Sequence, residues 1–176
     1  MKGRDVQISV TRDVFKLAQV FTISRGSRTE AQVLTVRITQ DGVTGWGECV
    51  PYARYDETLD SVTAEIEGLP VEIDREALYD LLPAGAARNA VDCALWDLEA
   101  KQAGVRAWEL AGLTAPGPEI TAYTLSLDEP EKMQAQAAKN AHRPLLKIKL
   151  GPPAALQPPA AVRARAPKAH SVRVHN

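Results

Sequence analysis

Hydrophobic positions near the amino terminus alternate with polar ones, which is the period of a half-buried β-strand. Residues 32–39 place Leu34, Val36 and Ile38 on one side of an extended segment. Gln40–Gly42 follows as a hairpin turn signal. The first predicted strand starts at 6–10 and continues at 14–23, the second lies at 32–39 and the third at 43–50, with a polar loop at 24–28. They form an antiparallel three-stranded meander.

The apolar period changes to that of a helix after the third strand. Two shorter helices are expected, capped by Asp56 and Asp74. In the third helix, apolar residues recur three and four positions apart: Ala87, Ala90, Val91, Ala94, Leu95 and Leu98. Its acidic residues, Asp92, Asp97 and Glu99, are interpreted as solvated or capping charges. A meander followed by packed helices predicts an α+β domain of roughly 110 residues.

The order strand, helix, strand follows in the remaining residues, 118–176. A strand at 120–127 precedes a helix beginning near Asp128 and ending near Ala141, and a strand at 145–150 comes next. This order predicts a βαβ unit and a parallel sheet. A second helix is expected after Pro152, although two prolines fall in its expected interior. Residues 172–174 are expected to add a third parallel strand.

Composition indicates a globular protein. The 176 residues are 45% hydrophobic and 24% charged, with a formal net charge of −1. Neither an export signal nor a membrane span is expected, because no apolar segment of the required length occurs. Cys49 and Cys93 suit buried free thiols rather than a disulfide framework or a metal cluster. These features favour a cytoplasmic protein.

Charge is distributed unevenly along the chain. The first 131 residues carry 12 basic and 22 acidic side chains, whereas residues 132–176 carry nine Lys or Arg and no acid. A basic tail can bind nucleic acid. Here no aromatic residue follows Tyr123 to stack on bases. The composition therefore argues against a nucleic-acid partner.

Two lysines, Lys147 and Lys149, end the strand at 145–150. Residues i and i+2 of a strand point to the same face, so both amines emerge together. Such a pair can be an ordinary solvated strand end. It can also lower the pKa of one amine until that amine acts as a base near neutral pH.

Several stretches resemble the enolase superfamily, in its mandelate racemase/muconate-lactonizing branch, and within it the bacterial L-Ala-D/L-Glu (dipeptide) epimerases. The stretches that carry the resemblance are 23–28, 45–55, 82–98, 121–124 and 145–150. The resemblance covers the amino-terminal half of such enzymes, up to about Gly151. It implies a capping domain at 1–117 and, at 118–176, the first two to three β/α units of a truncated TIM-type barrel.

The resemblance also implies a reaction and a site. Lys149 would remove or return the α-proton of a dipeptide, and Lys147 would lower the pKa of Lys149 and contact the substrate carboxylate. Thr124 and Arg25 would bind the substrate, with Arg28 as a weaker candidate. Mg²⁺ is the expected cofactor, a small dipeptide is the expected partner, and a homo-oligomer is left open.

The chain departs from the family pattern where the metal ligands belong. The family places three acids at the ends of the next barrel strands and a second lysine after them. Val174 or His175 stands where the first acid is expected, and no metal ligand or second base is present in this chain. We therefore expect the chain to be inactive alone. The alternatives are a non-catalytic cap remnant or interaction module, and another enolase-superfamily reaction such as cycloisomerisation or dehydration.

Overall fold

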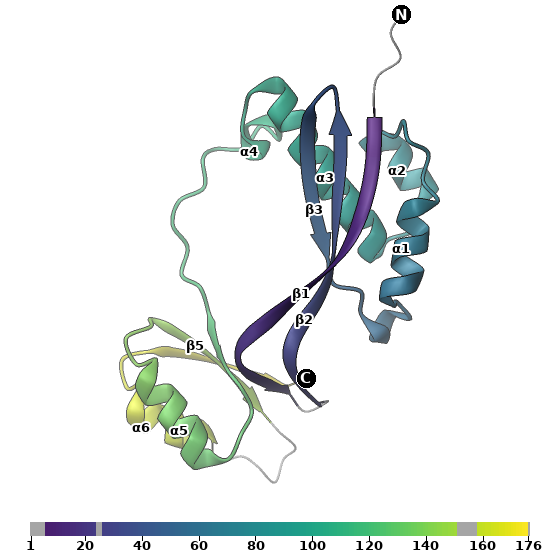
Figure 1. The fold of residues 1–176 in the computed structure, drawn as a ribbon. Coiled ribbons are helices and arrows are strands. Elements are labelled where there is room, and N and C mark those ends of the chain that lie inside the picture. Colours follow the sequence, from purple (N-terminus) through teal and green to yellow (C-terminus); the bar gives the residue numbers. More distant parts are fainter. Residues whose placement is uncertain (1–5, 24–25, 151–157, 176) are drawn as a thin grey trace, which may run out of the picture. The chain divides into compact units, whose positions relative to one another are not determined.

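The computed structural model describes residues 6–23, 26–150 and 158–175. The chain forms two compact units (Figure 1). The first contains residues 1–15 and 32–116, and the second contains residues 16–31 and 117–176. Each unit has its own hydrophobic core. The division into two domains between residues 117 and 118, expected from the sequence, stays a prediction.

The first unit contains most of a three-stranded sheet in the order β1-β2-β3. The strands are β1 (Val6–Ile23), β2 (Gly26–Gln40) and β3 (Val43–Cys49). β2 and β3 are antiparallel, and the turn between them places Asp41 and Gly42 at φ 51° and 82°. Glycine adopts such positive φ angles at no steric cost, so the predicted turn is confirmed.

Four helices follow the sheet: α1 (Leu59–Glu67), α2 (Arg75–Leu81), α3 (Ala86–Ala103) and α4 (Ala107–Leu110). The predicted apolar stripe of α3 is buried at all six positions. It packs with Leu34, Val36 and Ile38 of β2 and with apolar residues of α1 and α2 in one core. Gly104 ends α3 in the left-handed region, at φ 68°. The α+β class of this part of the chain is confirmed.

The second unit contains a parallel sheet in the order β4-β5-β6. Its strands are β4 (Tyr123–Leu125), β5 (Leu145–Leu150) and β6 (His170–His175), connected by α5 (Pro130–Lys139) and α6 (Pro158–Arg165). Both helices pack on one face of the sheet (Figure 1). Their buried Met133, Ala137 and Val162 belong to one hydrophobic core with Leu146 and Ile148 of β5. The predicted βαβ order is confirmed and extends to a third strand.

Some predicted boundaries were wrong. Thr58, not Asp56, caps α1: its hydroxyl accepts a hydrogen bond from Ser61 N at 3.0 Å, and Asp56 has φ 59°. β2 begins at Gly26, inside the expected polar loop. The prolines expected in the interior of the last helix are instead Pro158 and Pro159 at its start. Proline is tolerated there because the first turn needs no amide donor.

None of the helices in the described part of the chain combines the length and apolarity needed to cross a membrane.

Candidate functional site

The two lysines of β5 lie on the face of the parallel sheet that the helices leave uncovered. Leu146, Ile148 and Leu150 of β5 belong to the core under α5 and α6. Because side chains alternate along a strand, Lys147 and Lys149 lie on the opposite face. Their Cα atoms are two residues apart, about 6.6 Å in a parallel strand. The structure therefore brings the predicted lysine pair together on one face.

Thr124 lies beside this pair. The parallel register pairs Thr124 of β4 with Lys147 of β5, and Lys147 with Val172 of β6. Cα partners in neighbouring strands direct their side chains to the same face. Thr124, Lys147 and Lys149 thus share one surface, which we call the lysine face.

Burial differs between the two lysines. Lys149 is 8% exposed, whereas Lys147 is half-buried. Burial of an amine disfavours its charged form.

Of the two predicted arginines, Arg25 lies outside the described residues, and Arg28 is an exposed residue of β2 in the same unit as the lysine face.

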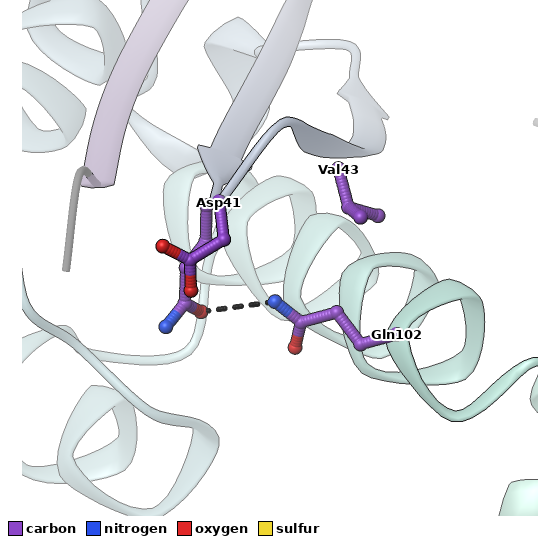
Figure 2. Close-up of a pocket in the computed structure, with 4 residues that line it drawn as sticks. Asp41, Val43 and Gln102 are labelled. Atoms are coloured by element: carbon purple, nitrogen blue, oxygen red, sulfur yellow. Dashed lines mark hydrogen bonds between the residues drawn. The ribbon is translucent and has the colours of Figure 1, made fainter.

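A hollow of about 370 Å³ occurs elsewhere, in the first unit. Figure 2 shows Asp41, Val43 and Gln102 around it, with Gln102 Nε2 donating to Gln40 Oε1 at 3.2 Å. Its lining offers one exposed carboxylate and neither a base of the lysine or histidine type nor a nucleophile. The lysine face is the stronger candidate for chemistry.

Two of the three acidic residues of α3, interpreted from the sequence as solvated or capping charges, bind protein groups and stay partly exposed. Asp97 Oδ2 accepts hydrogen bonds from Trp46 N at 2.8 Å and Lys101 Nζ at 2.6 Å. Glu99 accepts from Arg75 Nε at 3.0 Å. These contacts tie α3 to β3 and α2. A single-helix pattern does not reveal them, because the partners come from other elements.

Glu57 joins two segments of the first unit. Its Oε2 accepts from Tyr52 N at 3.0 Å, and its Oε1 accepts from Ala86 N at 2.7 Å, at the start of α3.

The buried thiol of Cys49 lies in the same region. Burial first, and then the negative charges of Glu57 and Glu48, raise the pKa of Cys49 to about 11. Cys49 is therefore a structural thiol, whereas Cys93, predicted to be buried, is exposed.

Magnesium prefers carboxylate oxygens and water. No Asp or Glu follows Glu131 in the sequence. Among the described residues, no group of three or more His, Cys, Asp or Glu side chains could hold a metal ion. The residues that the structure describes thus do not fit a magnesium site.

Comparison with known proteins identifies the family. The profile of the mandelate racemase/muconate lactonizing enzyme N-terminal domain matches residues 5–112. The chain belongs to this family. This is the family that the sequence motifs indicated. The matched residues include the sheet β1-β2-β3 and the helices α1 to α4.

Individual members of the family extend the match beyond residue 112. The L-Ala-D/L-Glu epimerase of Escherichia coli (strain K12) is 42% identical over 149 residues, which are 81% of this chain and 46% of that protein. An enolase family member from Agrobacterium tumefaciens, with homology to dipeptide epimerases and with bound sodium and L-Ala-L-Glu, is 47% identical with a TM-score of 0.90. That match covers 96% of this chain and 53% of the other.

A third relative is a complex with magnesium. The dipeptide epimerase of Enterococcus faecalis V583, complexed with Mg and L-Leu-L-Tyr, is 26% identical with a TM-score of 0.86, over 97% of this chain and 53% of that one. This chain therefore spans about half the length of the relatives it matches. The parallel strands β4, β5 and β6 with α5 and α6 correspond to the first units of a TIM-type barrel.

Proposed function

We propose that this chain carries the lysine-bearing half of a dipeptide epimerase site. The observation that carries the proposal is the lysine face, on which Lys147 and Lys149 lie beside Thr124 and opposite the helices. Membership of a family whose similar members are dipeptide epimerases supports the choice of substrate class. Lys149 is the acid/base, and Lys147 and Thr124 bind the dipeptide.

The proposed chemistry is transfer of the α-proton of the residue that bears the dipeptide carboxylate. The neutral amine of Lys149 takes the proton from the α-carbon, and the electron pair of the broken C–H bond moves into the adjoining carboxylate to form an enolate. Returning a proton to the same face restores the starting epimer. A base must be neutral to accept a proton, and Lys149 is 8% exposed.

Lys147 and Thr124 are assigned to binding. The ammonium group of Lys147 attracts the carboxylate of the dipeptide, and the hydroxyl of Thr124 supplies a hydrogen bond beside it. Arg25 stays a sequence-based proposal for a side-chain carboxylate of the substrate. Inversion also needs a proton donor on the opposite face of the enolate and stabilisation of its charge, and the family supplies the latter with a divalent metal.

The 176-residue polypeptide by itself is expected to show no turnover. The described residues offer no metal site for the enolate charge, which makes the proton transfer too slow. The check is incubation with magnesium and L-Ala-L-Glu in deuterated water. Loss of the glutamate α-proton signal above the rate of a protein-free sample would contradict this expectation.

A chimera tests the lysine assignment directly. Residues 1–150 of this chain are joined to the part of the E. coli epimerase that follows its matching segment. We expect α-proton exchange in the chimera and a loss of at least about a hundredfold with Lys149→Ala, the lower range for removal of a general base. The matched control is Lys139→Ala, which removes a lysine from α5 at the outer layer.

Three outcomes distinguish the hypotheses. An active chimera that tolerates Lys149→Ala would refute the lysine assignment. A folded but inactive chimera would favour the non-catalytic interaction module. A chimera that leaves dipeptides unchanged but cycloisomerises or dehydrates an acid would keep the lysine pair and change the substrate class.

A further inference from the structure

Part of the β1–β2 hairpin belongs to the second unit. Residues 16–31, which we call the arm, group with residues 117–176, whereas the rest of the same two strands belongs to the first unit. The arm meets the segment that follows β4. Leu127 N donates to the carbonyl oxygen of Thr22 at 3.0 Å, and Ser126 Oγ donates to the carbonyl oxygen of Val20 at 3.1 Å.

These two bonds use one edge of β1. Val20 and Thr22 are two residues apart, so their carbonyl groups point to the same side of the strand. β1 is the outer strand of its sheet, and its other edge faces β2. Residues 126 and 127 therefore occupy the open edge of β1 within the arm, where unpaired backbone groups otherwise face solvent.

Ser126 is unusual among the residues on this segment. It is 4% exposed, and together with Lys149 it makes up the buried polar or charged residues of the described chain. A buried hydroxyl that loses its hydrogen-bond partner is strongly destabilising, because it can no longer bond to water. The side chain of Ser126 is therefore held in the position that keeps its bond. Ser126 is also two residues beyond Thr124, on the same segment of chain.

We propose that Ser126 is a positioning residue that fixes the arm to the carboxyl end of β4. Its hydroxyl holds Val20, which keeps the adjacent Leu127–Thr22 bond closed and sets the arm at a defined place next to Thr124. Ser126 touches no substrate in this assignment. Its consequence for dipeptide binding rests on the proposed function, whereas its effect on the arm does not.

The test compares Ser126→Ala with Ser126→Thr in the full chain, using amide hydrogen exchange resolved by NMR. The alanine variant lacks the donor, and we expect the Leu127 amide to exchange roughly two- to tenfold faster, as the loss of one net hydrogen bond implies. The threonine variant retains a hydroxyl and is expected to restore the wild-type rate. The amide of Leu98, in the core of α3, reports on the first unit and is expected to stay unchanged.

Two results would overturn the positioning role. One is an unchanged Leu127 amide in Ser126→Ala. The other is equal acceleration at Leu127 and Leu98, which would mark general destabilisation.

Titration with L-Ala-L-Glu is a separate measurement: Ser126→Ala should weaken binding and Ser126→Thr should restore it. If the wild-type chain does not bind the dipeptide, the assignment of Lys147 and Thr124 to binding fails, and the exchange rates still decide the role of Ser126.

Discussion

Two glycines determine how closely the main helix of the first unit approaches its sheet. A Cβ atom on Gly45 would lie 2.1 Å from the carbonyl oxygen of Ala94, and one on Gly47 would lie 1.9 Å from that of Ala90. Both contacts are with helix backbone, which cannot rotate aside as a side chain can. The Gly45-Trp-Gly47 motif therefore sets the spacing between β3 and α3.

Gly47→Ala is accordingly expected to destabilise the chain. Overpacking against a backbone atom forces the helix and sheet apart, and we expect a loss of about 3 kcal/mol in the free energy of unfolding, at the upper end of measured overpacking effects. Urea unfolding monitored by circular dichroism measures it. Gly117→Ala is the control, because a Cβ there meets nothing within 4 Å. Equal stability of both variants would show that the close contact is absent.

Single residues were predictable where the signal is local. The shared face of Lys147 and Lys149 follows from strand period alone, and the register pairs Thr124 with Lys147. Ser126 and Glu57 were not predicted. Their partners are 106 and 29 residues away in sequence, and such pairs form only when the chain has folded.

At the level of elements, the start of α3 depends on a side chain from outside the helix. Gly85 precedes the helix and has no side chain with which to cap it. Glu57 accepts the Ala86 amide instead and also accepts Tyr52 N from the segment after β3. A carboxylate is favourable here because it lies at the positive end of the helix. Glu57 thus links the sheet, the loop and the helix.

Glu57→Ala is expected to cost about 2–3 kcal/mol in unfolding free energy, because two amides lose a charged acceptor. Glu65→Ala, an exposed position in α1, is the control and should change stability by less than about 0.5 kcal/mol. Thermal and urea unfolding compare them. Glu57→Ala also removes a negative charge that raises the pKa of Cys49, so this pKa should fall below its present value of about 11. A stable variant with an unchanged Cys49 would contradict this role.

Element types were predicted better than element ends. Helical and strand periods located the major elements, because burial of one face dictates both periods. The ends depend on capping groups that compete over a few residues, as Thr58 and Asp56 do. The short helix α4 was missed, since four residues carry too little periodicity to be recognised.

At the level of the whole molecule, the two units are connected by an exposed segment. Residues 113–122 belong to no helix or strand, and Leu113 and Ile120 are 64% and 66% exposed. Exposed segments without helix or strand are preferred sites of proteolysis.

Brief thermolysin treatment is expected to cut the chain first in this segment, because the enzyme cleaves before large apolar residues. Mass spectrometry would identify the ends of the products. Leu113→Gly with Ile120→Gly is the control and should slow this cleavage markedly. First cleavage within α3 or β5 would show that the segment is protected in solution.

The arm gives the chain a second connection between its units, since the polypeptide passes from one unit to the other after residues 15, 31 and 116. Two hydrogen bonds would scarcely hold two separate molecules at micromolar concentration. Within one chain, the covalent segment keeps the partners at an effective concentration in the millimolar range. A single nick in that segment removes this advantage, so the affinity of the arm for residues 126 and 127, which follow β4, then becomes a measurable bimolecular quantity.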